Sequence, residues 1–454
     1  WLAPATLLLA GALIVSSMPS AEERAKAEME ASGLTWNATT RTITVDRESH
    51  KKKVGDTTMV DSTIGMFISS ARLVHLSKYL LELGPTRIDL SRCHRLTDVE
   101  GLRELGALQV VDLSQCSMLT NVDGLQGLGA LQTLDLSGCA NLTNVDGLRG
   151  MGALQALDLR YCGILTNVDG LQGMGALQTL NLYGCEMLTN VDSLQGMGAL
   201  ETLDLSFCIG LTNVDGLQGM GALETLDLYE CASLTSVKGL RGLGALQKLN
   251  LGSCYRLTNV DGLQGMGALQ TLDLSGCHRL TNVGGMKGLD ALQTLNLSAC
   301  DNLTNVDGLQ GMGALQTLNL SDCANLTNVD SLIGLGNLQT LELTSCYSLS
   351  NVDGLQGLGA LQTLDLSFCT QLIDLVDATG LASLKVLEIY GNKRIRSLTP
   401  LFACDSLRFV GLQGCCTQVP QSEFRKLANL SVDTLKSHVD SAASSIRQQL
   451  RRSD

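Results

Sequence analysis

A 23-residue repeat runs through most of this chain and constrains its fold more than any other feature. Thirteen of the sixteen cysteines, from Cys93 to Cys369, recur at intervals of 23 residues without exception. Two further steps reach Asn392 and Cys415, so asparagine occupies the cysteine position once. Self-similarity at a short fixed period is typical of solenoids, in which each repeat packs only against its neighbours. The sequence therefore predicts fifteen stacked coils over residues 86–430.

Each coil has the same pattern of apolar residues, at positions −8, −5, −3, +3, +6, +9 and +12 relative to its cysteine. Leu134 and Leu136 share one face of a short strand, because side chains alternate along an extended chain. The later apolar residues lie three apart, and too few residues remain for a long helix, so they indicate extended and 3-10 segments. Stacking predicts an α/β solenoid with a parallel β-sheet on its concave face and the 3-10 segments on its convex face.

The repeat string LxxLxLxxCxxLTxVxxLxxL resembles the short, helix-poor leucine-rich-repeat (LRR) class of phosphatase regulators and bacterial internalins, with cysteine in place of their asparagine. Its coil length and LTDV-type stretch are most similar to cysteine-containing LRR proteins of trypanosomatids. This resemblance covers residues 86–430. It implies a horseshoe or arc and a habit of binding proteins, but it names no partner, because a fold does not determine a function.

Composition and periodicity divide the chain into four parts. Residues 1–17 fit the apolar region of a secretory signal, with a start at Met18 as the alternative. Residues 18–85 predict a helix near 22–31, a strand near 40–45, and an amphipathic capping helix that begins at Asp61-Ser62 and stops at Gly84-Pro85. The solenoid follows over 86–430. Residues 431–454 have a helical period and predict a second cap, with a dimerising helix as the alternative.

The cysteine ladder has a functional and a structural interpretation. Redox sensing or metal storage is disfavoured because the chain has no CxxC, HExxH or zinc-finger spacing. Stacked coils would place neighbouring Cβ atoms about 4.8 Å apart, beyond the roughly 3.5–4.5 Å of a disulfide. We therefore predict buried, unoxidised thiols that donate weakly to the backbone of a neighbouring coil, as the asparagine ladder of other LRR proteins does. We expect no metal and no cofactor.

A row of acids is expected on the strand face, four residues before each cysteine. Carboxylates on adjacent strands would repel by roughly 0.9 kcal/mol in water. Asparagines interrupt the row in four coils, and glycine occupies it in the last. The row indicates either a groove for a basic peptide or the ordinary strand composition of LRR proteins. Its acids are Asp89, Asp112, Asp135, Asp158, Asp204, Asp227, Asp273, Glu342, Asp365 and Glu388, and its amides are Asn181, Asn250, Asn296 and Asn319.

A second acidic row precedes Gly-Leu or Ser-Leu on the convex side. Aspartate is a favoured N-cap residue, so this row predicts caps for the short convex turns. It consists of Asp123, Asp146, Asp169, Asp192, Asp215, Asp261, Asp307, Asp330 and Asp353.

Differences between coils are concentrated at positions −2, −1, +1 and +2 around the cysteine, where the strand should leave the concave face. These positions hold eight of the thirteen Tyr and Phe residues. Because interface hot spots favour tyrosine and arginine, we predict an exposed partner-binding edge, with drift at solvent-tolerant positions as the alternative. The predicted site comprises Tyr161, Tyr183, Phe207, Tyr229 and Tyr255 with the acids Asp158, Asp204 and Asp227.

Catalytic patterns are missing from the sequence. The five histidines are scattered, and the recurring Gly-Leu-Gln-Gly-Met-Gly follows no predicted strand and opens no predicted helix. The net charge of −13 disfavours nucleic acid and anionic membranes. No apolar segment reaches the about 20 residues of a membrane helix. We therefore expect no catalytic residues, no nucleic-acid ligand and no transmembrane span.

The leading hypothesis is a non-enzymatic protein-interaction scaffold whose partner is a protein, basic where it meets the acids. A self-associating surface protein is the second hypothesis, with a homo-oligomer formed through the C-terminal helix. A regulatory subunit that docks an enzyme such as a phosphatase is the third. Glycosylation sequons favour a secreted or cell-surface protein over a cytoplasmic one, and they begin at Asn37, Asn141, Asn296, Asn302, Asn319, Asn325 and Asn429.

Overall fold

The computed structural model describes residues 20–45, 52–54, 57–59, 68–375, 380–415 and 419. The chain divides into two compact units between Ile209 and Gly210, and each is described by itself. The predicted signal segment (1–17) and the predicted C-terminal helix (431–454) lie outside the described residues. No helix among the described residues is long and apolar enough to cross a membrane.

Unit 1 begins with a cap that closes the first coil. The hairpin of β1 (Leu34–Asn37) and β2 (Thr42–Val45) follows helix α2 (Ala21–Glu30), so the predicted helix and strand of this region are confirmed. Strand β2 pairs in parallel with β5 (Arg87–Asp89), the strand of the first coil. A separate hairpin is formed by β3 (Lys52–Val54) and β4 (Thr57–Met59).

The capping helix α3 (Ser70–Leu83) buries Leu73, Leu76, Leu80 and Leu83. It ends at Gly84, whose φ of 56° is the left-handed conformation that glycine adopts without strain, so the predicted stop is confirmed. Its predicted start is wrong. Ser69 caps the helix by accepting a hydrogen bond from the Arg72 backbone N–H at 3.3 Å, and Ile68 precedes the helix.

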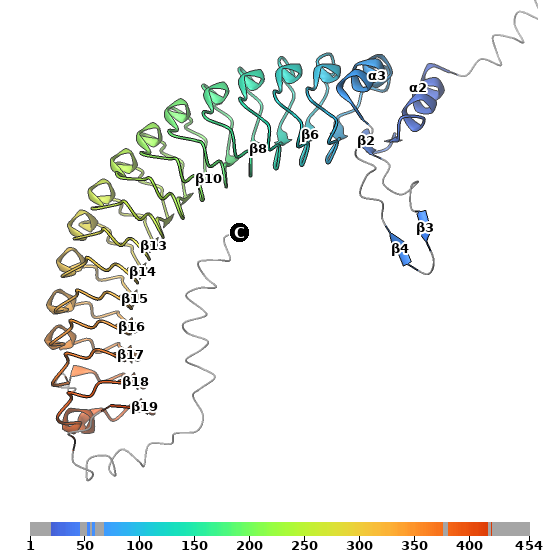
Figure 1. Cartoon of the computed structure of the whole chain (residues 1–454). Helices are drawn as coiled ribbons and strands as arrows, with labels where there is room; N and C mark the ends of the chain where they lie inside the picture. Colours follow the sequence, from blue (N-terminus) through green and yellow to red (C-terminus); the bar gives the residue numbers. More distant parts are fainter. Residues whose placement is uncertain are drawn as a thin grey trace, which may run out of the picture. The chain divides into compact units, whose positions relative to one another are not determined.

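The coils of unit 1 follow the predicted order of strand and 3-10 turn. Their strands pair in parallel and in register, and Figure 1 shows them on the inner side of the stack with the 3-10 turns on the outer side. The strands after β5 are β6 (Val110–Asp112), β7 (Thr133–Asp135), β8 (Ala156–Asp158), β9 (Thr179–Asn181) and β10 (Thr202–Asp204). The 3-10 helices are η2 (Glu100–Leu102), η3 (Asp123–Leu125), η4 (Asp146–Leu148), η5 (Asp169–Leu171) and η6 (Asp192–Leu194).

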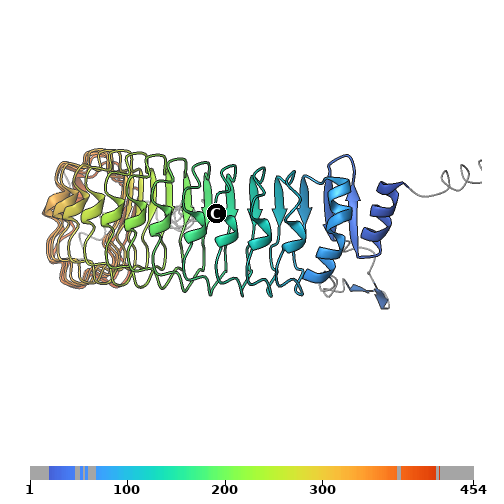
Figure 2. The same cartoon turned by 90° about the horizontal axis from the view of Figure 1, so that it is seen from above.

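Unit 2 repeats this arrangement, with its 3-10 turns on the outer side of the stack (Figure 1), and Figure 2 shows the turns of neighbouring coils in a row. Its strands are β11 (Thr225–Asp227), β12 (Lys248–Asn250), β13 (Thr271–Asp273), β14 (Thr294–Asn296), β15 (Thr317–Asn319), β16 (Thr340–Glu342), β17 (Thr363–Asp365), β18 (Val386–Glu388) and β19 (Phe409–Gly411). Its 3-10 helices are η7 (Asp215–Leu217), η8 (Lys238–Leu240), η9 (Asp261–Leu263), η10 (Gly284–Met286), η11 (Asp307–Leu309), η12 (Asp330–Leu332), η13 (Asp353–Leu355) and η15 (Thr399–Ala403).

The apolar positions of the repeat form the core in both units. In the coil of Cys139, for example, the cysteine and the leucines at −5, −3, +3 and +9 are almost fully buried. The coils also approach closely at the 3-10 turns, where a Cβ added to Gly147 would lie 2.2 Å from the Val122 carbonyl oxygen. Glycine recurs at this position because a larger side chain would press on the neighbouring coil, although Ser193, Ser331 and Pro400 occupy it in three of the described coils.

The second acidic row does not cap the convex turns as predicted. The N-cap residue of η4 is Val145, which makes no side-chain cap hydrogen bond, and Asp146 is already the first residue of the turn. Instead, Asn144 accepts a hydrogen bond from the Asp146 backbone N–H at 3.1 Å. The asparagine two residues before the acid therefore orders this turn, because its side-chain oxygen reaches back to the backbone as in an Asx turn.

Candidate partner-binding face

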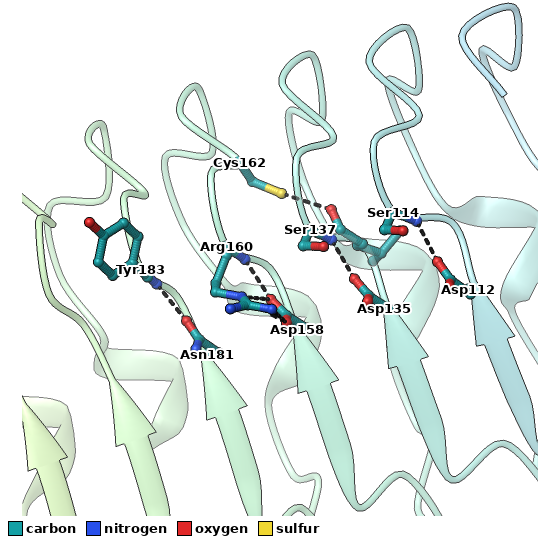
Figure 3. Close-up of polar contacts among 10 residues, drawn as sticks. Asp112, Ser114, Asp135, Ser137, Asp158, Arg160, Cys162, Asn181 and Tyr183 are labelled. Carbon is teal, nitrogen blue, oxygen red and sulfur yellow. Dashed lines mark hydrogen bonds and ion pairs between the residues drawn. The ribbon is translucent and has the colours of Figure 1, made fainter. Parts of the chain in front are cut away.

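The acids and amides of the strand-end row make the same local hydrogen bond in successive coils. In each case Oδ1 accepts from the backbone N–H two residues later: 2.9 Å for Asp112, 2.8 Å for Asp135, 3.0 Å for Asp158 and 2.9 Å for Asn181 (Figure 3). This Asx turn leads the chain out of the strand. Either aspartate or asparagine can occupy the row because both supply Oδ1. The row therefore serves in part to hold this turn.

The row also places charge on the strand face of unit 1. Asp112, Asp135 and Asp158 are register partners on adjacent strands. Arg160 binds Asp158 with Nη2 2.8 Å from Oδ2, and its hydrogen bond with this carboxylate raises the pKa of the Arg160 guanidinium (Figure 3). Thr133, which precedes Asp135 by two residues on the same face, is small and exposed. The face is therefore flat and acidic.

In unit 2 the amides of the row donate hydrogen bonds to acids on adjacent strands, which reduces the repulsion between carboxylates. Asn250 donates to Asp227 at 3.3 Å, Asn296 donates to Asp273 at 3.3 Å, and Asn319 Nδ2 lies 2.6 Å from a Glu342 carboxylate oxygen. Burial raises the pKa of Asp273, which is among the few buried acids of the row. The unit 2 row therefore mixes charge with amide hydrogen bonds, whereas four of the five row positions from β6 to β10 of unit 1 are acids.

The structure divides the predicted aromatic edge between the units. In unit 1, the ring centroids of Tyr161 and Tyr183 are 5.1 Å apart and those of Tyr183 and Phe207 are 4.9 Å apart. Tyr161 is 57% exposed, but Tyr183 and Phe207 are half-buried. The expectation that all of these rings are simply exposed is therefore wrong, because each of the two half-buried rings packs against a ring of the neighbouring coil.

Unit 2 holds the other two predicted aromatics. Tyr229 is half-buried, and Tyr255 is 40% exposed. The Tyr255 ring stacks on the imidazole of His278 at a centroid distance of 5.7 Å. His278 Nδ1 in turn lies 2.9 Å from a carboxylate oxygen of Asp301. These three residues occupy position +1 of successive coils, so side chains at this position contact one another between coils.

The residue directly before the cysteine adopts a positive φ in all fifteen described coils. Glycine satisfies this geometry in some of them, as at Gly138 (φ 71°) and Gly184 (φ 70°). In two coils of unit 1 an aromatic residue takes it instead, Tyr161 (φ 59°) and Phe207 (φ 59°). A left-handed backbone costs a non-glycine residue about 1–2 kcal/mol, and a bulky side chain makes this conformation unusual.

Sequence reasoning missed several exposed apolar residues beside the aromatic edge. Ile164 and Met187 at position +2 and Ile209 at position +1 are 43%, 56% and 43% exposed. Met118, also at +2, is 49% exposed. The available signal was the comparison between coils: position +2 is apolar only at Met118, Ile164 and Met187, and is polar or glycine in the others.

The thiol ladder agrees with its structural interpretation. Cys162 Sγ donates to the carbonyl of Leu136, 26 residues earlier, at 3.4 Å (Figure 3), and the same bond recurs along both units. Asn392 is fully buried and donates to the equivalent carbonyl of Leu366 at 2.7 Å. Burial raises the pKa of Cys208 and Cys277 to about 12, so thiolate is scarce at neutral pH.

These thiols should resist alkylation in the native protein. With iodoacetamide at neutral pH, we expect Cys116 through Cys369 to remain unmodified for hours and to react fully after denaturation, because these thiols are buried in the native protein. Peptide mass spectrometry of native and denatured samples measures this directly. Rapid native labelling of most ladder cysteines would contradict the packing of the coils.

No group of three or more metal-ligating side chains occurs among the residues that the structure describes. No protein-family model matches the chain, and no curated protein matches it in sequence. Its likeness to other proteins is therefore structural.

Three solved structures illustrate this likeness. An internalin of Listeria monocytogenes is 16% identical with a TM-score of 0.42, over 82% of this chain and 86% of the internalin. A leucine-rich-repeat protein of Leptospira interrogans is 19% identical with a TM-score of 0.43, over 74% and 98%. TLR13, solved in a complex with single-stranded RNA, is 20% identical with a TM-score of 0.50, over 77% of this chain and 56% of TLR13, so the match spans little more than half of that protein.

At these identities the likeness shows the fold alone. The strands pair in register every 23 residues, and a 3-10 turn returns the chain in most coils. Together with the likeness to TLR13, this arrangement identifies the chain as a leucine-rich-repeat solenoid.

Proposed function

We propose that this protein is a non-enzymatic scaffold that binds a partner protein through its strand face and the adjoining strand ends, and that the partner is basic where it contacts this face. The single observation that carries the proposal is the acidic row of unit 1, in which Asp112, Asp135 and Asp158 lie side by side on adjacent strands. Neighbouring carboxylates repel each other, and a cationic partner relieves that repulsion.

The predicted site residues have defined roles in this proposal. In unit 1, Asp158 and Asp204 supply charge, and Tyr161, Tyr183 and Phe207 supply apolar contact area. In unit 2, we propose the same two roles for Asp227 and for the pair Tyr229 and Tyr255. Tyrosine is well suited to this because it combines a large apolar ring with a polar hydroxyl.

The acidic row argues against an anionic ligand on this face. TLR13 was solved with single-stranded RNA, but binding to nucleic acid depends largely on Lys and Arg contacts with phosphates. From Val110 to Asp204 the strands themselves contain no Lys or Arg, and the nearby Arg160 is held by Asp158. We therefore propose a protein rather than a nucleic-acid partner.

A photo-crosslinker placed at one position in each of two neighbouring coils tests the proposal. Thr179 and Gln172 are both exposed, Thr179 in strand β9 and Gln172 directly after the 3-10 helix η5. In the full-length protein in its native cell, we expect a benzoylphenylalanine at Thr179 to form an adduct with a foreign protein, and one at Gln172 to form none. The yield of this adduct should fall when salt is added, because salt screens exposed charges.

The other outcomes separate the remaining hypotheses. An adduct between two copies of this chain would support a self-associating protein instead. An equal yield from Gln172, or an adduct with nucleic acid, would contradict binding of a protein at the strand face.

A further inference from the structure

We infer that the strand-end turns of unit 1 anchor an amphipathic basic segment of the partner, with its apolar side chains on Tyr161, Ile164, Met187 and Ile209. These four residues are named the turn patch. They come from three successive coils, those of Cys162, Cys185 and Cys208, and each is at least 43% exposed. This inference rests on the proposed function, and it specifies the surface and the chemistry of the partner.

The other coils serve as an internal control for the turn patch. Where unit 1 has Ile164 and Met187, equivalent positions hold residues such as Asn141, Ser233 and Asn302. The fold therefore makes no demand for an apolar side chain at position +2. Ile164, Met187 and Ile209 lie in successive turns and are exposed to water. Packing of the coils does not require apolar side chains there, whereas a surface that contacts a partner does.

The Tyr161 ring is held in place by the neighbouring coil. The φ of 59° at Tyr161 lies where glycine stands in neighbouring coils, and the ring lies against Gly184, where an added Cβ would be 3.2 Å from the Tyr161 ring. A bulky residue held in this conformation persists only where something offsets its cost. Contact with the half-buried Tyr183 offsets part of it.

The charged residues around the turn patch indicate that the partner segment is positively charged. Asp158 and Asp204 lie on the strands of these coils, and Glu186 is exposed at position +1, directly before Met187. The one basic side chain of these three coils is Arg160, which pairs with Asp158 at 2.8 Å. An apolar surface flanked by more carboxylates than cations is complementary to a segment with one apolar face and one cationic face.

The spacing of the coils suits such a segment. Adjacent strands are about 4.8 Å apart, and one turn of an α-helix rises about 5.4 Å. Apolar side chains one helical turn apart can therefore contact successive coils of the turn patch.

The test measures how the full chain binds three synthetic peptides, using isothermal titration calorimetry. One is an amphipathic helix of leucine and lysine, the second contains the same residues in scrambled order, and the third has glutamate in place of lysine. We expect the amphipathic basic peptide to bind at least tenfold more tightly than either control peptide. Equal binding of the scrambled peptide, or no binding of the basic peptide, would overturn the inference.

Variants then locate the contact. Tyr161→Gly, and Ile164→Ser combined with Met187→Ser, should each weaken binding at least tenfold while the melting temperature stays within a few degrees, because these side chains are exposed. Phe368→Gly is the matched control. Phe368 is 48% exposed and has a φ of 60° at the same repeat position in unit 2, so its replacement relieves the same strain but should leave the affinity unchanged.

A charge variant distinguishes failure of this inference from failure of the proposed function. Asp135→Asn combined with Asp204→Asn keeps the oxygen that makes the Asx turn, as Asn181 does naturally, and removes only charge. If this variant loses affinity and the turn-patch variants do not, the strand face binds and the turn patch does not. If neither set loses affinity, both proposals are wrong.

Discussion

Replacing Asn392 with aspartate is expected to lower the free energy of unfolding by about 3–5 kcal/mol at neutral pH, the range found when a buried charge is left without its partner. Asn392 is fully buried, and its Nδ2 donates to the carbonyls of Leu366 at 2.7 Å and Ile389 at 3.2 Å. A carboxylate there would direct negative charge at two carbonyl oxygens and would have no donor to offer them.

The control for this variant is supplied by the repeat itself. Asn392→Cys introduces the residue of the other coils, in which Cys369 donates to the Leu343 carbonyl at 3.2 Å. We expect this change to cost only about 1 kcal/mol, the contribution of one hydrogen bond. Denaturant unfolding of both variants beside the wild type measures the difference.

The aspartate variant should also become dependent on pH. Burial would raise the folded-state pKa of the new carboxyl above its unfolded value of about 3.9. Since the charged form is the one disfavoured in the folded state, the loss of stability should be largest above the raised pKa and should shrink as the pH falls through it. Equal stability of the aspartate and cysteine variants at pH 7 would contradict a buried donor at this position.

Leu182→Ala is expected to destabilise unit 1 by about 2–5 kcal/mol, the cost of truncating a buried leucine in a packed core. Leu182 is fully buried, and its carbonyl accepts the Sγ bond from Cys208 of the next coil at 3.3 Å. Because each coil packs only against its neighbours, we expect hydrogen exchange to accelerate most in the coils adjoining Leu182.

Thr179→Ala provides the matched control for Leu182→Ala. Thr179 lies three residues earlier in the same coil, but it is exposed on the strand face. Its replacement should change stability by less than about 0.5 kcal/mol. Similar losses for the two variants would mean that the alternation of buried and exposed residues along β9 is misassigned.

The sequence alone determined the architecture of this protein. The parallel strands, the 3-10 turns and the buried thiols all follow from one 23-residue pattern, because in a solenoid the environment of one coil is the environment of the next. The burial of Leu134 and Cys139 can therefore be predicted from their own coil, and the same pattern in the other coils supports the prediction. The end of α3 at Gly84 was also predictable, because the left-handed conformation that stops the helix depends only on the local residue.

Tertiary structure decided the features that depend on contacts between particular side chains and on backbone geometry that several residue types share. Glycine and tyrosine both occur at the position of Tyr161, so the sequence does not reveal its positive φ. The burial of Tyr183 depends on rings in two neighbouring coils. The short convex turn begins at Asp146 itself and not after it, so Asn144 rather than the acid holds it. The exposure of Met187 was likewise established only by the structure. An apolar residue in the sequence does not by itself show whether its side chain is buried or exposed as a contact surface.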